Sequence, residues 1–203
     1  LGSVGGIDRE HLARLRRLAQ LVEPAAVSEH LCWSRVGRRH FNELLPMPFS
    51  EEAIRVLVRH IGEAQEALGR ELLVENVSSY HEFAESAMAE GEFVAEVAAR
   101  AGCRLLLDVN NVHVNAVNHG FDARGFLAAI PVSRVAEIHL AGHEARGAML
   151  VDTHGSPVSP AVWSLYEEAL ARFGPVPTLL ERDNDIPAFE ALDDERRAAQ
   201  ARL

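Results

Sequence analysis

Five short apolar segments alternate with segments of helical periodicity, and this alternation restricts the possible folds more than any other feature. Strands are expected over residues 26–31, 71–76, 104–109, 135–140 and 177–181, with a shorter one over 149–152. Helices are expected over residues 8–22, 50–68, 90–101, 123–129 and 159–173, followed by an exposed helix over 193–203. No hairpin between consecutive strands is visible. The alternation therefore predicts βα units on a parallel sheet.

The length of the chain limits how such a sheet can be arranged. With 203 residues and no linker segment, the chain is expected to be a single domain over residues 1–203. Five units cannot close an eight-stranded barrel, which needs about 250 residues. The sequence therefore predicts either an open five-stranded sheet or the larger part of a barrel without its first strands. The start at Leu1, without Met, favours the partial barrel.

Charge and cysteine content exclude several classes of protein. The 30 acidic residues exceed the 20 basic ones, all of them Arg, and the formal net charge is -10. This balance argues against a nucleic-acid partner, because such proteins usually carry a basic patch. Two cysteines, Cys32 and Cys103, cannot build a disulfide scaffold, which favours a reducing compartment. No apolar run is long enough for a membrane and no signal peptide is visible, so we expect a cytoplasmic protein.

Each of the five expected strands ends in a side chain that commonly binds metals. In chain order these side chains are His30, Glu75, Asp108, His139 and Glu181. The carboxyl ends of parallel strands meet at one edge of the sheet, where α/β proteins build their sites. Taken singly, each residue has a plainer explanation, such as a hydrogen-bonded core histidine or an ion-paired glutamate. The full set favours a metal site, because buried carboxylates are costly unless they are paired or bound to a metal.

A loop adds Asp152 and His154 to the candidate ligands, since their D-x-H spacing places both side chains on one side of an extended segment. All these donors are nitrogen or oxygen atoms, which suits Fe, Mn, Zn or Co and argues against a cysteine-based structural zinc site. The carboxylates outnumber the needs of one ion, so a cluster of two or three ions with bridging carboxylates is predicted. Glu75, Asp108 and His139 are the candidate catalytic residues. By contrast, His60 is interpreted as a surface residue.

Eight motifs, in order along nearly the whole chain, resemble the DUF692 family, also labelled UPF0276. This family comprises multinuclear non-heme iron-dependent oxidative enzymes and includes the methanobactin biosynthesis oxidase. The motifs are residues 28–33 (SEHLCW), 45–48 (LPMP), 75–80 (ENVSSY), 106–112 (LLDVNNV), 118–122 (NHGFD), 139–143 (HLAGH), 152–155 (DTHG) and 181–184 (ERDN).

The resemblance implies a TIM barrel of the xylose-isomerase-like type, here without about three N-terminal strands, one of which brings a ligand histidine. It implies three iron positions. The first has His30, Glu75 and that missing histidine as ligands; the second has Glu75, Asp108, His139 and Glu181; the third has Asn111, Asp152 and His154. At the third position, alternation along the strand from Asp108 favours Asn110 over Asn111. Because an open barrel exposes sheet edges, we also expect that the 203 residues do not fold alone.

The resemblance also implies an activity, in which iron and O2 oxidise cysteine residues of a ribosomally synthesised precursor peptide. A partner protein usually presents that peptide to the enzyme. Two alternatives remain open from the residues themselves. One is a zinc- or manganese-dependent hydrolase or isomerase on the same barrel, and the other is a non-catalytic metal-binding module.

Overall fold

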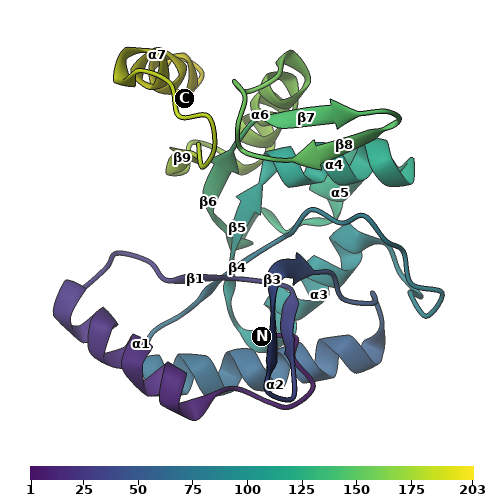
Figure 1. The fold of residues 1–203 in the computed structure, drawn as a ribbon, viewed down its shortest axis with the longest axis vertical. Coiled ribbons are helices and arrows are strands. Elements are labelled where there is room, and N and C mark those ends of the chain that lie inside the picture. Colours follow the sequence, from purple (N-terminus) through teal and green to yellow (C-terminus); the bar gives the residue numbers. More distant parts are fainter.

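Five parallel strands form the central sheet of the computed structural model, which describes residues 1–203 (Figure 1). Their order in space, β1-β4-β5-β6-β9, follows their order along the chain. Their bounds are Ser28–His30 (β1), Leu73–Glu75 (β4), Arg104–Asp108 (β5), Val135–Leu140 (β6) and Thr178–Leu180 (β9). Every neighbouring pair is parallel, so all five carboxyl ends lie at the same edge. The predicted α/β class with a parallel sheet is confirmed.

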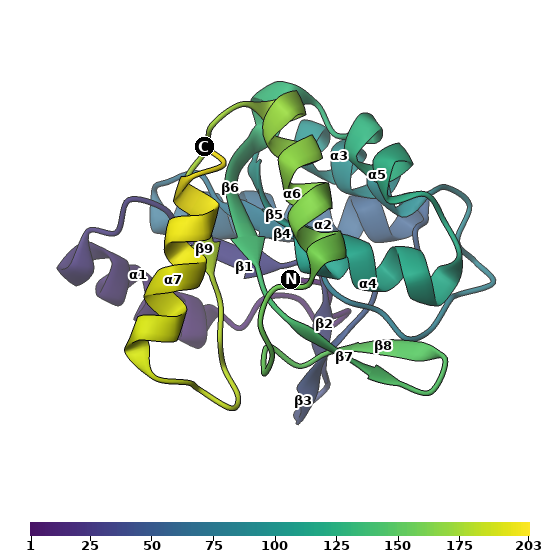
Figure 2. The ribbon, with the colours of Figure 1, turned by 90° about the horizontal axis from the view of Figure 1, so that it is seen from above.

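Seven α-helices precede, connect or follow these strands. Their bounds are Arg9–Val22 (α1), Glu51–Leu68 (α2), Glu90–Ala101 (α3), Val109–His119 (α4), Ala123–Ala129 (α5), Pro160–Phe173 (α6) and Phe189–Gln200 (α7). Figure 2 shows the strands as a curved row with α2, α3, α5 and α6 along one side. Between these layers lies the apolar core, which includes Leu57, Val97, Leu105, Ile138 and Tyr166. No helix is both long enough and apolar enough to cross a membrane.

Several helices begin and end at the capping residues that the sequence indicates. Asp8 and Ser50 accept hydrogen bonds from the first-turn amides of α1 and α2. Gly69 and Gly102 end α2 and α3 in the left-handed conformation that glycine adopts without strain. One local interpretation is wrong, because His60 is fully buried rather than a surface residue. Its Nδ1 lies 2.6 Å from the carbonyl oxygen of Leu1.

The expectation of no hairpins is also wrong, since two antiparallel hairpins interrupt the βα pattern. One pairs β2 (Trp33–Val36) with β3 (Arg39–Leu45), and the other pairs β7 (His143–Arg146) with β8 (Met149–Asp152). Both follow the carboxyl end of a sheet strand and stand outside the main sheet. Strands β2, β3 and β7 lack the apolar alternation of a half-buried strand, whereas β8 carries Met149, Leu150 and Val151 and coincides with the short strand expected over residues 149–152. A glycine at positive φ, Gly37 or Gly147, begins each two-residue turn.

The third expected strand is shorter than the sequence suggested. It stops at Asp108, whose carboxylate accepts a 2.7 Å hydrogen bond from the Asn111 amide and thereby caps α4. We expected the strand to continue to Val109, because the apolar character of the segment continues there. Asn110 and Asn111 therefore lie in the first turn of a helix, where strand alternation does not apply.

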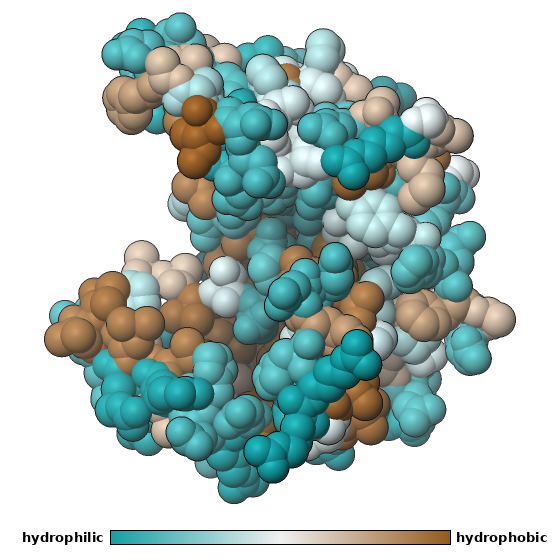
Figure 3. Space-filling model, viewed as in Figure 1, coloured by the Kyte–Doolittle hydropathy of each residue, from teal (hydrophilic) through white to brown (hydrophobic).

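The two outer strands of the sheet are less covered than the three inner ones. Beside β1, α1 has no buried residue, and its Leu21 and Val22 are mostly exposed. Beside β9, the apolar side chains of Leu179, Ile186 and Phe189 are exposed as well. Figure 3 shows the hydrophobic surface of α1 at lower left, separated by a hollow from the region of α7 above it. The sheet is thus open at both edges.

Candidate metal centre

Alternation along the strands separates core residues from candidate ligands. Leu105 and Leu107 of β5 belong to the core beneath the helices, whereas Asp108 points to the opposite face. The register places His30 beside Glu75 and Asp108 beside His139. Parallel pairing therefore brings ligands that are distant in sequence onto one face, at the carboxyl edge of the sheet.

Four of the predicted ligands meet at the centre of this edge. Glu75, Asp108, His139 and Glu181 each offer one nitrogen or oxygen atom, and these atoms all lie within 4.8 Å of one another. His139 Nδ1 is 3.3 Å from Glu75 Oε1 and 3.4 Å from Glu181 Oε1. The first three side chains are buried, and Glu181 is half-buried. Such a group of donors could bind a metal ion.

Each of the two glutamates also faces a second histidine. The other oxygen of Glu75, Oε2, lies 3.3 Å from Nε2 of His30 on the outer strand β1. The other oxygen of Glu181, Oε2, lies 3.4 Å from Nδ1 of His154. Both carboxylates thus have one oxygen toward the centre and one toward a neighbouring histidine, an arrangement that suits bridging between adjacent ions.

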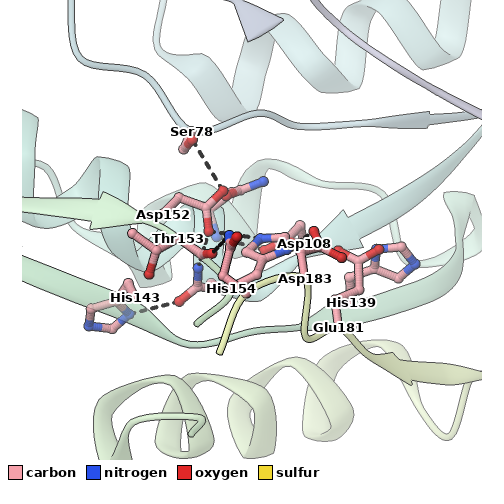
Figure 4. A network of polar contacts seen from close by, with 12 residues as sticks. Ser78, Asp108, His139, His143, Asp152, Thr153, His154, Glu181 and Asp183 are labelled. Atoms are coloured by element: carbon pink, nitrogen blue, oxygen red, sulfur yellow. Dashed lines mark hydrogen bonds and ion pairs between the residues drawn. The ribbon is translucent and has the colours of Figure 1, made fainter. Parts of the chain in front are cut away.

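His154 belongs to the loop that returns from the β7–β8 hairpin. Its Nε2 lies 2.8 Å from Oδ1 of Asp152, and its backbone has a φ of 50°, in the left-handed region (Figure 4). The amide of His154 donates to the carbonyl of Gly142, and the amide of Asp183 donates to the carbonyl of His154. Gly142 is required here, because a Cβ at this position would overlap the backbone carbonyl of Ser156. A strained backbone that several contacts fix in place is common at functional sites.

The structure separates the roles of the two neighbouring asparagines. Asn110 donates from Nδ2 to Oδ1 of Asp152 at 2.8 Å and accepts from Nδ1 of His143 at 2.8 Å, so both polar atoms of its side chain have a partner. Asn111 donates from Nδ2 to the carbonyl of Asn76, whereas its buried Oδ1 has no partner. A free acceptor is therefore found on Asn111 and not on Asn110.

Buried polar atoms without hydrogen-bond partners concentrate at this site. They include Asp108 Oδ2 and Asn111 Oδ1, both on predicted ligands. A buried polar atom without a partner costs about 1–3 kcal/mol. Metal coordination would satisfy both atoms, so these residues fit a bound metal cluster.

The electrostatics of the site also fit bound cations. Burial, followed by the nearby charges of Asp152 and Glu75, raises the pKa of Asp108 well above its usual range. Burial opposes the charged form of His139, but the carboxylates of Glu181 and Glu75 outweigh it and raise the pKa of His139 to about 10. Burial acts in the same way on His154, and Asp152 outweighs it to give a pKa of about 9. The cluster thus attracts positive charge, which metal ions would supply.

Several residues outside the predicted set hold the ligands in place. Asn76 pairs with the backbone of Asp108, donating to its carbonyl at 2.9 Å and accepting from its amide at 3.0 Å. Ser78 donates to Oδ2 of Asp152, while Tyr80 accepts from the Asp152 amide. A polar run directly after a buried strand, residues 76–80, is the sequence signal for these contacts. The ring of His113 packs 5.1 Å from that of His143 and contacts none of the predicted ligands.

Comparison with known proteins gives consistent matches over the whole chain. Residues 1–203 match the family described as "RiPP precursor modification enzyme MbnB/TglH/ChrH". A UPF0276 protein of Rhizorhabdus wittichii is 54% identical over 200 residues, which cover 98% of this chain and 72% of the relative. A UPF0276 protein of Acaryochloris marina is 48% identical over 203 residues, which cover 100% of this chain and 74% of the relative.

Among solved structures, the chain is similar to a xylose isomerase domain containing protein from Salmonella typhimurium LT2. The TM-score is 0.58 at 14% identity, and the match covers 96% of this chain and 70% of that protein. This likeness concerns the fold alone. It agrees with the expected xylose-isomerase-like barrel, of which the chain covers a part.

Proposed function

Because the chain belongs to the MbnB/TglH/ChrH family of RiPP precursor modification enzymes, we propose that it is an iron-dependent oxidase of peptide cysteines that uses O2. The observation that carries the proposal is the buried cluster of Glu75, Asp108, His139 and Glu181 at the carboxyl edge of the sheet. Its imidazole and carboxylate donors suit non-heme iron.

We assign two or three irons to the site. His30 and Glu75 would hold the first, and Asn111, Asp152 and His154 would hold the third. The central cluster would hold the second, with Glu75 facing the first position and Glu181 facing the third. Support comes from the two-sided contacts of these glutamates, from the unpaired Oδ1 of Asn111, and from the contact of His154 with Asp152.

Iron bound here would supply the activation of O2 and a coordination position for the cysteine sulfur. Metal binding at His139 and His154 would displace a proton from one ring nitrogen of each, because only neutral imidazole binds a metal. The buried walls around Asp108 exclude water and strengthen its attraction for a cation. His30 and Glu181, at the two edges of the sheet, are more exposed than the three inner ligands.

The substrate would be a cysteine-containing precursor peptide, and we propose that a partner protein presents it. Family membership supports a precursor peptide as the class of substrate. The net charge of -10 agrees with a partner other than a nucleic acid.

The test is a turnover assay on the full-length protein, purified without oxygen and loaded with iron. We expect O2 uptake together with a mass change at cysteine when a cysteine-containing precursor peptide and the partner protein are supplied. The matched peptide with serine in place of cysteine should not react. Turnover restored by zinc without O2 uptake would contradict the oxidase and favour the hydrolase or isomerase.

A further inference from the structure

A large cavity lies beside the metal centre and has no role in the proposed chemistry. Its volume is about 620 Å³, within the range of about 300–1,000 Å³ that is usual for ligand pockets. It is enclosed by the loop after β4, the first turn of α3, and the α4–α5 connection with α5. The lining residues used below are Phe49, Met88, Glu90, His119, Phe121 and Phe126.

The cavity adjoins the metal centre through one loop. Ser78 donates to Asp152, a proposed iron ligand, while the next residue, Ser79, lines the cavity and contacts His119 at 2.8 Å. A small void of about 10 Å³ lies between Glu90 of the cavity and Asn76, which follows the ligand Glu75. The loop of residues 78–79 therefore contacts both the proposed iron site and the cavity.

The charges around the cavity are all of one sign. Four carboxylates line it, those of Glu82, Glu90, Glu92 and Asp122, and none of the 20 Arg residues does. Two of these carboxylates already accept hydrogen bonds from backbone amides: Glu92 accepts from the Ala89 amide, and Asp122 caps α5. The lining thus excludes anions and favours a cation.

Glu90 is the carboxylate best placed to bind that cation. It is half-buried, and its only hydrogen-bond partner is Asn115, whose Nδ2 lies 3.1 Å from both carboxylate oxygens. Burial raises the pKa of Glu90 to about 7, and the hydrogen bond from Asn115 offsets this only in part. No Arg side chain pairs with Glu90. A bound cation would relieve the cost of this buried carboxylate.

The apolar residues that line the cavity favour an organic cation over a metal ion. Phe49, Phe121 and Phe126 present aromatic rings and Met88 an apolar side chain, none of which is a good ligand for a hydrated ion. An arginine or lysine side chain suits such a site, because its apolar stem packs on the walls while its charged end reaches the carboxylate.

From this geometry we infer that the cavity binds a basic side chain of the precursor peptide while a nearby cysteine occupies the iron site. The inference rests on the proposed function and names a feature of its substrate. It makes Glu90 a specificity residue for a basic position close to the modified cysteine.

The test uses three small probes and the full-length protein. The probes are N-acetylarginine methylamide, its uncharged analogue N-acetylcitrulline methylamide, and free arginine. Binding is followed by NMR of methionine methyl groups, since Met47 and Met88 line the cavity whereas Met149 lies on the β7–β8 hairpin. We expect the arginine amide to shift the Met47 and Met88 signals, leave Met149 unchanged, and bind about tenfold more tightly than the citrulline amide.

Two variants assign the effect to Glu90. Glu90→Gln should remove the preference for arginine over citrulline, while Glu96→Gln, on the same helix but outside the cavity, should retain it. Equal affinities for the two amides in the unmutated protein would overturn the inference without any variant. Free arginine carries the same guanidinium and should also shift the Met47 and Met88 signals, and the absence of a shift with either arginine probe would overturn the inference as well.

Iron content and cysteine oxidation, measured on the same samples, separate this inference from the proposed function. If the protein prefers arginine but does not oxidise cysteine, the cavity remains a cation site and the proposed oxidase function is contradicted. An active oxidase that does not distinguish arginine from citrulline would remove only the cavity assignment.

Discussion

The three inner strands and the two outer strands deliver the same kinds of ligand into different surroundings. Glu75, Asp108 and His139 come from inner strands, and all are less than 8% exposed. The outer ligands are more accessible, with 38% of the His30 side chain and 28% of the Glu181 side chain exposed. Burial strengthens the attraction of the inner ligands for a cation. We therefore expect metal retention to depend more on the inner strands than on the outer ones.

The largest effect should come from Asp108→Asn. Asparagine also caps helices well, so α4 should be retained, but the buried negative charge between the ions is lost. We expect loss of the central iron together with an increase in the stability of the metal-free protein, because burial disfavours the charged form of Asp108. Elemental analysis and thermal unfolding in a chelator measure the two effects. A variant with full iron content would contradict the importance of the inner ligands.

The pH dependence of the metal-free protein should report the inner charge cluster. The pKa values of His139 and His154 are raised to about 10 and about 9. Their charged forms therefore stabilise the folded state below pH 6.5, and this contribution is lost as the pH rises through about 9 to 10. We expect the melting temperature in chelator to fall across that window. The iron-loaded protein should not show this fall, since its histidines are already neutral, and a parallel fall in both forms would argue against metal binding at them.

A smaller effect is expected from His30→Ala on the outer strand. The side chain is partly exposed and contributes little packing, so the unfolding temperature should change little. Iron content should fall by about one ion per chain, with the central cluster retained. His40→Ala, at an exposed histidine of the β2–β3 hairpin, is the matched control and should keep every ion. Complete loss of iron in His30→Ala would show that inner and outer ligands are not separable.

The smallest effect should come from Asn110→Ala, which removes a residue that orients a ligand. Asn110 connects His143 to Asp152, so its loss should loosen one side of the Asp152 carboxylate, while the contacts of that carboxylate with Ser78 and His154 remain. We expect about a 10- to 100-fold loss of affinity for the third ion and little change at the other positions. Competition with a chelator measures the affinities. Asn110→Gln should not restore the geometry, because its longer side chain displaces the amide, and unchanged affinity in both variants would remove this role.

The inner strands were also easier to predict than the connections between them. Apolar runs that end in a single ligand mark β4, β5 and β6, because strands covered on both faces are continuously hydrophobic. Of the four hairpin strands only β8 was predicted, since Met149, Leu150 and Val151 form an apolar run, whereas β2, β3 and β7 lack apolar alternation. The distinction between Asn110 and Asn111 could not be made either, since it depends on the point where Asp108 ends a strand and caps a helix. The cavity beside Glu90 joins segments that only the fold brings together.

The central claim is that the inner strand ends form an iron site. The most direct measurement is the iron content per chain of the full-length protein purified without oxygen, compared between the unmutated protein and Asp108→Asn. The account predicts two or three irons per chain in the first and a clear loss in the second, with both proteins folded. An unmutated protein without iron, or equal iron content in the two proteins, would contradict it.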